Sequence, residues 1–119
     1  MITLRYIFLI LISLHGLVHL LGYSRAFHLG LEAPGTAQIS KVNGVFWFMA
    51  TCLFLIASVS FFFNKDWWRI VALASVFLSQ FLIFSAWQDA KFGTIINGII
   101  LIVILIGIKS NLPTSNFQL

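Results

Sequence analysis

Charged side chains are scarce in this sequence, and their scarcity excludes a water-soluble globular protein. Only 8% of the 119 residues are charged, and 61% are hydrophobic. Soluble domains carry about 25% charged and about 45–50% apolar residues. The polar groups of this chain are too few to cover the surface of a globule in water. The composition therefore predicts an integral membrane protein.

Cysteine is almost absent as well. The single Cys52 stands between Thr51 and Leu53 in an apolar segment. The chain thus has neither a disulfide framework nor a CxxC pair, and its cysteine content says nothing about the redox compartment. A lone cysteine in such surroundings usually serves as a small hydrophobic residue.

The sequence also lacks a basic patch, although its net charge is +4. Its seven lysines and arginines stand singly between apolar runs, as helix-end anchors and topology determinants do. We therefore expect no nucleic-acid partner. Arg5, Lys65, Arg69 and Lys109 fall on one side of the predicted membrane, and Arg25, Lys41 and Lys91 on the other. The side with more basic residues is expected to be cytoplasmic, and both termini lie on that side.

Four apolar segments predict the fold, at about residues 4–23, 45–63, 68–87 and 92–108. A helix of about 20 residues matches the ~30 Å hydrocarbon core of a bilayer. The apolar residues 26–31 either extend the first helix or lie along the interface. We expect an all-α protein, a four-helix transmembrane bundle of up-down-up-down topology over residues 1–109. A short disordered tail follows at residues 110–119.

Small residues on two of these segments predict the seams where helices pack. Gly44, Thr51 and Ser58 recur every seven residues in the second segment. In the third segment the small residues on one face are Ala72, Ser75, Ser79 and Ala86. Small side chains let neighbouring helices approach closely in a membrane.

A pair of histidines gives the first segment its most distinctive feature. His15 and His19 are four residues apart, so both imidazoles point to one face, with Cβ atoms about 5–6 Å apart. Ionisable groups at membrane depth usually face the interior of a bundle. Asp89 begins the loop on the same side as the end of this helix. We predict a His19–Asp89 hydrogen bond that fixes the imidazole tautomer.

Further polar residues are within reach of the same region. The primary candidates for a polar cluster or ligand site are His15, His19, Gln88, Asp89, Lys91 and Asn97. The secondary candidates are His28, Glu32 and Gln80. The simplest interpretation is that these groups hydrogen-bond to one another and lock the helices together. We expect no catalytic residue among them.

A metal or haem site is an alternative interpretation of the histidine pair. A metal would use His15 and His19 at i, i+4 spacing. A third ligand would come from Asp89, His28 or Glu32. Metalloprotease helices of this spacing carry a glutamate directly after the first histidine, where Gly16 stands here. Two imidazoles on one helical face cannot supply both axial ligands of one haem. We expect no metal and no cofactor.

Two more alternatives use the polar face differently. Inward ionisable groups joined by hydrogen bonds suit a proton or small-solute pathway. Four helices leave little room for a pore, so such a pathway would require an oligomer. The other alternative is a cleft for a lipid or a quinone, open at the outer leaflet.

Two motifs carry a resemblance to a known family. His15-Gly16-Leu17-Val18-His19-Leu20-Leu21-Gly22 and Trp87-Gln88-Asp89-Ala90-Lys91-Phe92-Gly93-Thr94-Ile95 resemble a family of uncharacterised bacterial four-helix membrane segments. The family's segment also occurs at the N-terminus of longer proteins of unknown function. The resemblance covers nearly the whole chain and implies residence in a bacterial inner membrane, but it brings no activity with it. In size and architecture the chain is also similar to DoxX-like membrane proteins.

These observations predict a small non-enzymatic protein of the bacterial inner membrane. Its leading role is that of an accessory or scaffold subunit that binds a membrane-protein partner or a lipid. The expected partners are the lipid bilayer and either a membrane protein or further copies of the chain. The alternatives are a proton-coupled transporter or channel and a redox module that binds haem, quinone or metal.

Overall fold

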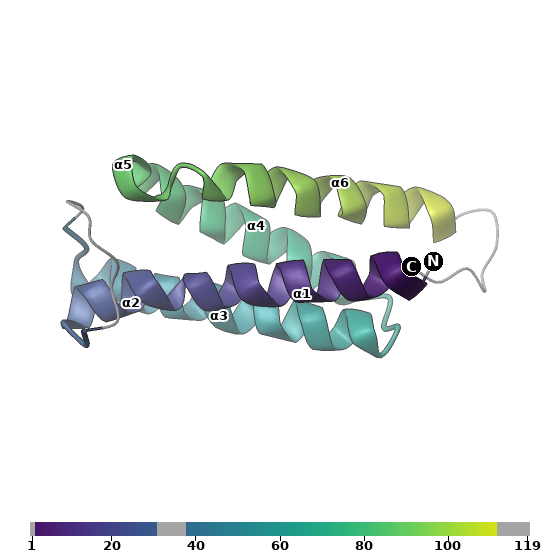
Figure 1. The fold of residues 1–119 in the computed structure, drawn as a ribbon, viewed down its shortest axis with the longest axis horizontal. Helices are drawn as coiled ribbons and strands as arrows, with labels where there is room; N and C mark the ends of the chain where they lie inside the picture. The colour runs from purple at the N-terminus through teal and green to yellow at the C-terminus, as the bar shows by residue number, and fades with distance from the viewer. Residues whose placement is uncertain (1, 31–37, 112–119) are drawn as a thin grey trace.

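The protein is all-helical, as its composition predicts. The structure, a computed structural model, describes residues 2–30 and 38–111 and contains no strand in that part of the chain. Its helices are α1 (Ile2–Val18), α2 (Leu20–Phe27), α3 (Lys41–Phe62), α4 (Trp68–Ser85), α5 (Trp87–Ala90) and α6 (Gly93–Asn111). Together they form an elongated body, with α1, α3, α4 and α6 as its long rods (Figure 1).

Several helix ends differ from their predicted positions: α3 begins at Lys41 instead of near residue 45, and the third predicted helix ends at Ser85, before the short α5. The first helical rod does not stop near residue 23, because α2 continues along the direction of α1 to Phe27 (Figure 1). His28 ends it in the left-handed conformation, with φ 57°, and its backbone N–H donates to the carbonyl of Ser24. At the other end of the chain, residues 110 and 111 of the predicted tail belong to α6. Residues 112–119 lie outside the described part of the chain.

The start of α3 is fixed by a side-chain cap. The hydroxyl of Ser40 accepts a hydrogen bond of 3.1 Å from the backbone N–H of Asn43. Such a cap satisfies one of the N–H groups that the first helical turn leaves without a backbone partner. It therefore sets the position at which α3 turns alongside α2.

Most contacts between the helices join neighbours in one series. The helix α3 lies against α1, α2 and α4, and α4 in turn lies against α6. By contrast, α1 and α6 touch over only a short stretch. Side chains of α1 and α6 nevertheless share one buried apolar cluster, and a cleft separates the first rod from α5 and the start of α6.

Two apolar clusters form the core. The larger one gathers around Phe8, Ile12 and Phe54, with residues from α4 and α6. The smaller one contains Trp47, Ala50, Leu82 and Ala86. On α4, Ser79 lies between the positions that contribute to the two clusters. A layer of polar side chains therefore separates two apolar ends of the interior.

The predicted seams are where the helices meet. Gly44, Thr51 and Ser58 are all buried, and so are the four small residues of the other seam, which are Ala72, Ser75 and Ser79 of α4 and Ala86 directly after it. At Gly44 a Cβ atom would overlap the Cβ of Ala26, and at Gly22 it would overlap the indole ring of Trp47. The two glycines thus let α2 and α3 approach closely.

Replacing Gly22 tests this contact. We expect Gly22→Ala to lower the free energy of unfolding by about 1–3 kcal/mol, because the added methyl group must displace the buried indole of Trp47. Gly98→Ala is the matched control, since a Cβ there meets nothing within 4 Å. The control should leave stability unchanged or raise it by up to about 1 kcal/mol. Unfolding in detergent, followed by circular dichroism, measures both; equal effects would contradict the close approach.

Candidate functional site: a buried polar chain beside an apolar cleft

His15 and His19 both lie on the inner face of the first helical rod. Their exposed fractions are 8% and 2%, and their ring centroids are 4.9 Å apart. The rings contact Phe54 of α3, and the ring of His19 also contacts Trp47. The histidine face is therefore enclosed by the aromatic side chains of α3.

The ring of His19 forms two hydrogen bonds. Its Nδ1 lies 2.8 Å from the backbone oxygen of His15, and its Nε2 lies 2.7 Å from Oγ of Ser79. A carbonyl oxygen only accepts, so Nδ1 carries the proton and donates. A neutral ring then accepts the hydroxyl proton of Ser79 at Nε2. The bond to Ser79 joins the first rod to α4.

The same ring explains why α1 and α2 are separate helices. In a continuous helix the backbone N–H of His19 would donate to the carbonyl of His15. Here the imidazole engages that carbonyl, and the backbone N–H donates instead to the carbonyl of Gly16, at 3.1 Å. The resulting local tightening interrupts the helix at His19 without changing its general direction (Figure 1).

Asn97 connects α6 to both other walls. Its amide oxygen lies 2.8 Å from Nε2 of His15, which must donate to it. Its amide nitrogen donates to the hydroxyl of Ser79 at 3.0 Å and to Oε1 of Gln80 at 3.1 Å. Only 3% of Asn97 is exposed. One buried amide thus links α6 with α1 and α4.

Gln80 completes the chain of hydrogen bonds. Its amide nitrogen donates to Oγ1 of Thr94 at 2.9 Å, while its oxygen accepts from Asn97. The polar chain, as we call it, consists of His15, His19, Ser79, Asn97, Gln80 and Thr94. Each member has at least one side-chain partner. Such a satisfied network makes burial of polar groups tolerable in a low dielectric.

The predicted hydrogen bond between His19 and Asp89 is wrong. Both ring nitrogens of His19 bond to other groups, as described above. Ser79 takes the place expected for Asp89 because it faces His19 from within α4, whereas Asp89 lies in α5, beyond the end of that helix. The tautomer is instead fixed by a backbone carbonyl.

The other predicted residues are spread over two environments. Asn97 and Gln80 belong to the polar chain, whereas Gln88, Lys91 and His28 are exposed. Lys91 lies over the ring of Phe92, with Nζ 5.7 Å from its centroid. Glu32 lies outside the described residues. The structure therefore joins the two histidines to Asn97 and Gln80 and leaves Gln88, Lys91 and His28 outside the polar chain.

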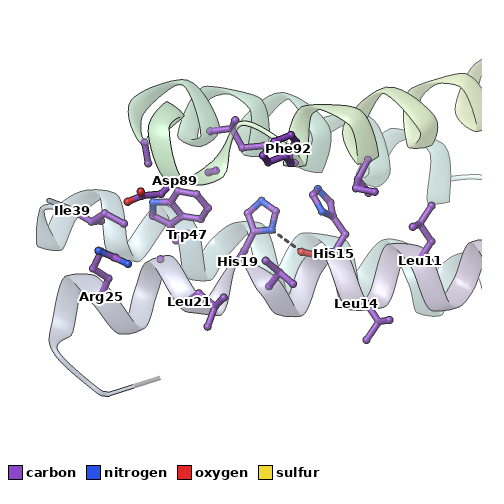
Figure 2. A pocket seen from close by; sticks show the side chains of 17 residues that line it. Leu11, Leu14, His15, His19, Leu21, Arg25, Ile39, Trp47, Asp89 and Phe92 are labelled. Atoms are coloured by element: carbon purple, nitrogen blue, oxygen red, sulfur yellow. Dashed lines mark hydrogen bonds between the residues drawn. The ribbon is translucent and has the colours of Figure 1, made fainter. Parts of the chain in front are cut away.

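An apolar cleft lies beside the polar chain (Figure 2). It has a volume of about 560 Å³ and separates the first rod from α5 and the start of α6. Its walls are mainly aliphatic and aromatic, and His15 and His19 line its middle. Arg25 and Asp89 lie together at one end of it (Figure 2). The cleft thus has mainly apolar walls, which the two histidines interrupt, and a polar end.

Trp47 lines this cleft and was not among the predicted site residues. Its exposed fraction is 5%, and its indole Nε1 is buried without a hydrogen-bond partner. A signal for it exists in the sequence, since Trp47 lies three residues after Gly44 and four before Thr51. These spacings place it on the predicted packing face. Ser79 was likewise assigned only to a seam.

Metal or haem binding would have to disrupt the polar chain. Three of the four ring nitrogens of His15 and His19 are engaged in hydrogen bonds. Within residues 2–30 and 38–111, no group of three His, Cys, Asp or Glu residues is placed to hold a metal ion. The arrangement suits mutual satisfaction of polar groups better than ligation.

A double-mutant cycle tests the link between α1 and α6. We expect His15→Ala and Asn97→Ala each to destabilise the protein, and to couple by about 0.6–1.7 kcal/mol, from the average to the maximum measured for hydrogen bonds between membrane helices. Unfolding free energies in detergent provide the measurement.

Ser13 supplies the control for this cycle, because its hydroxyl bonds to Ser58 at 2.7 Å, outside the polar chain. Ser13→Ala and Asn97→Ala should therefore be additive. A coupling of zero between His15 and Asn97 would show that their contact does not stabilise the fold.

Comparison of the chain with protein-family models, with curated proteins and with solved structures finds no match.

Proposed function

We propose that this chain is an accessory protein of a bacterial inner membrane that crosses the bilayer four times, up-down-up-down, and holds one membrane amphiphile in its cleft. The single observation that carries the proposal is the cleft itself, an apolar space with a polar end between two helical arms. In the accessory role, the bound amphiphile is kept for a membrane-protein partner.

The lengths of the helices support the membrane part of the proposal. The segments Thr3–Phe27, Lys41–Phe62 and Trp68–Ser85 are each long and apolar enough to cross a membrane. The apolar part of the fourth segment, Gly93–Ile106, is shorter, but α6 as a whole has 19 residues. At about 1.5 Å per residue this length approaches the ~30 Å of the hydrocarbon core. Large apolar side chains are exposed on every long helix, as lipid contact requires.

Cysteine labelling tests the topology. Lys41 begins α3 and Lys65 follows its end, and both side chains are exposed. In a Cys52→Ser background, we expect a membrane-impermeant maleimide to label Lys65→Cys only from the cytoplasmic side and Lys41→Cys only from the opposite side. This orientation follows from the distribution of basic residues. Labelling of both positions from one side would contradict a span between them.

The character of the cleft supports binding of an amphiphile. Ligand sites usually measure about 300–1,000 Å³ and combine apolar walls with a few polar groups, and a volume of about 560 Å³ falls in this range. Leu14 and Val18 contribute exposed apolar side chains to the wall, and Arg25 and Asp89 lie at the polar end. An acyl chain or an isoprenoid tail would fit the first part, and its head the second.

The polar chain supports an accessory role over transport. A proton or solute pathway needs groups that exchange hydrogen-bond partners along a wet track. Here Asn97 alone forms three side-chain hydrogen bonds, and His19 uses both ring nitrogens. This degree of satisfaction favours a rigid wall behind the cleft.

Filling the cleft tests the proposed function. Val18→Trp places a large side chain on the cleft wall at a position that is 55% exposed, so the core is not disturbed. We expect the amount of amphiphile that copurifies in mild detergent to fall about tenfold, equivalent to about 1.4 kcal/mol of binding free energy. Lipid extraction followed by mass spectrometry measures it.

Leu17→Trp is the matched control, since Leu17 is 44% exposed on the same helix and does not line the cleft. The control should retain the amphiphile of the unmodified protein. If Val18→Trp and Leu17→Trp retain equal amounts, the cleft is not the binding site.

A further inference from the structure

We propose that Nδ1 of His15 accepts a hydrogen bond from an uncharged hydroxyl group of the amphiphile, so that the cleft selects hydroxylated ligands over ligands that lack this donor. The inference rests on the proposed function and deepens it by assigning one polar contact within the mainly apolar walls of the cleft.

A series of hydrogen bonds fixes which nitrogen of the His15 ring carries the proton. The series starts at the backbone carbonyl of His15, which only accepts, so the neutral ring of His19 has its proton on Nδ1 and accepts at Nε2. The hydroxyl of Ser79 has a single proton, which it donates to this Nε2. Its oxygen can then only accept from Asn97, whose amide must turn its nitrogen towards Ser79 and its oxygen towards His15. Nε2 of His15 therefore carries the proton, and Nδ1 is a bare acceptor.

Nδ1 of His15 is accessible from the cleft. Among the ring nitrogens of His15 and His19, it alone forms no hydrogen bond within residues 2–30 and 38–111. In those residues the one side-chain polar atom that is both fully covered and unpaired is Nε1 of Trp47. Nδ1 of His15 is unpaired without being fully covered. Because His15 is only 8% exposed and lines the cleft, the uncovered surface opens into the cleft.

The surroundings of the ring leave room for an occupant beside it. Figure 2 shows the ring of His15 directed from the first rod towards the α5 and α6 side of the cleft. Gly93 lines the same cleft and presents no side chain there, and a Cβ atom at Gly93 would lie 3.6 Å from Cε1 of His15, the carbon between the two ring nitrogens. Buried polar groups are nearly always paired. An occupant of the cleft that brings a donor would therefore complete the hydrogen bonding of His15.

The chemistry of the site favours a hydroxyl over other donors. An ammonium group would be costly among the aliphatic side chains of the walls, because a buried charge needs a charged partner. An amide N–H is joined to a carbonyl, a strong acceptor that would need a donor of its own. The neighbouring nitrogens of His19 and Asn97 are already engaged. A hydroxyl has one proton to donate, and Nδ1 of His15 accepts it.

The position of His15 along the cleft indicates where the ligand carries its hydroxyl. His15 precedes Arg25 by ten residues, and α2 continues the direction of α1 (Figure 1). At 1.5 Å per residue the two positions lie about 15 Å apart along the rod. A ligand with its head at the polar end therefore carries the hydroxyl within its tail, as a hydroxylated acyl chain does. A ligand whose hydroxyl is itself the head, such as an isoprenoid alcohol, would use only the middle of the cleft.

The tautomers are tested first, with the full chain labelled with ¹⁵N-histidine in nanodiscs of phosphatidylcholine, a lipid that has no hydroxyl group. Nitrogen NMR distinguishes protonated from unprotonated ring nitrogens. We expect His15 to be protonated at Nε2 and His19 at Nδ1, so that two histidines one helical turn apart adopt opposite tautomers. A His15 ring protonated at Nδ1 would overturn the inference.

Two pairs of probes then test the donor and separate its sources. One pair is 12-hydroxyoctadecanoic acid and its 12-methoxy counterpart, and the other is an isoprenoid alcohol and its methyl ether. Each ether keeps the oxygen and lacks the proton. We expect the unmodified protein to bind the hydroxy acid about tenfold more tightly than its ether, as one hydrogen bond implies. A preference confined to the isoprenoid pair would identify a hydroxyl head instead of a hydroxylated tail.

His15→Phe removes the acceptor and keeps an aromatic ring on the cleft wall. We expect this variant to bind both members of each pair equally. Comparison within a pair cancels the loss of the contact with Asn97, which affects both members. Leu14→Phe is the matched control, because Leu14 lines the cleft on the same helix and its replacement leaves the acceptor in place. The control should keep the preference for the hydroxyl.

A further measurement on the unmodified protein does not depend on the folding of any variant. The ¹⁵N resonance of Nδ1 of His15 should move to lower frequency when the hydroxylated probe binds, as it does when the lone pair accepts a hydrogen bond. An unmoved resonance, equal binding within both pairs, or a preference that persists in His15→Phe would each overturn the inference and leave the proposed function intact. Failure of the unmodified protein to bind any of the four probes would overturn both.

Discussion

The two hydrogen bonds of the His19 ring constrain more of this structure than any other contact. One of them takes the carbonyl of His15 away from the helix backbone, and the other reaches across to Ser79 of α4. The first interrupts the helix between Val18 and Leu20, and the second fixes the rotation of the first rod against α4. With this rotation fixed, Gly22 comes to lie against Trp47 and His15 comes to face Asn97. The packing of α2 on α3 and the contact of α1 with α6 both follow.

The cleft is a consequence of how α1 and α6 are joined. Membrane helices in general gain little from burying apolar surface against each other, because lipid tails are equally apolar, and they associate through close packing and polar links. The proposed membrane insertion would apply the same terms to this fold. Along α1 and α3, and along α3 and α4, small residues allow close packing. Between α1 and α6 the hydrogen bond of His15 with Asn97 connects helices that otherwise touch over a short stretch. On one side of this link, Ile12 of α1 and Ile100 of α6 belong to one buried cluster, and on the other side, towards α5, the cleft separates the two arms.

The sequence predicts the elements of this fold better than it predicts their contacts. Hydropathy alone located the apolar segments, and the recurrence of small residues identified the faces that pack, including Gly44 and Ser79. It could not assign the partner of His19, because several polar groups lay within reach and the choice depends on helix rotation and register. An acidic partner was predicted from charge, but a hydroxyl inside the neighbouring helix was nearer. The sequence also contains no sign of the helix interruption at His19. It arises because the imidazole competes with the backbone N–H of the same residue for the carbonyl of His15.

Trp47 is a second example of a residue whose burial follows from the sequence pattern but whose hydrogen bonding does not. Among the consecutive aromatic residues Phe46, Trp47 and Phe48, the packing stripe points to the middle one as buried, while its neighbours are exposed. Pattern cannot say whether a buried indole finds an acceptor, because that depends on what lies opposite its edge. The polar chain engages three of the four ring nitrogens of His15 and His19, whereas the indole nitrogen of Trp47 is covered by the protein and has no hydrogen-bond partner.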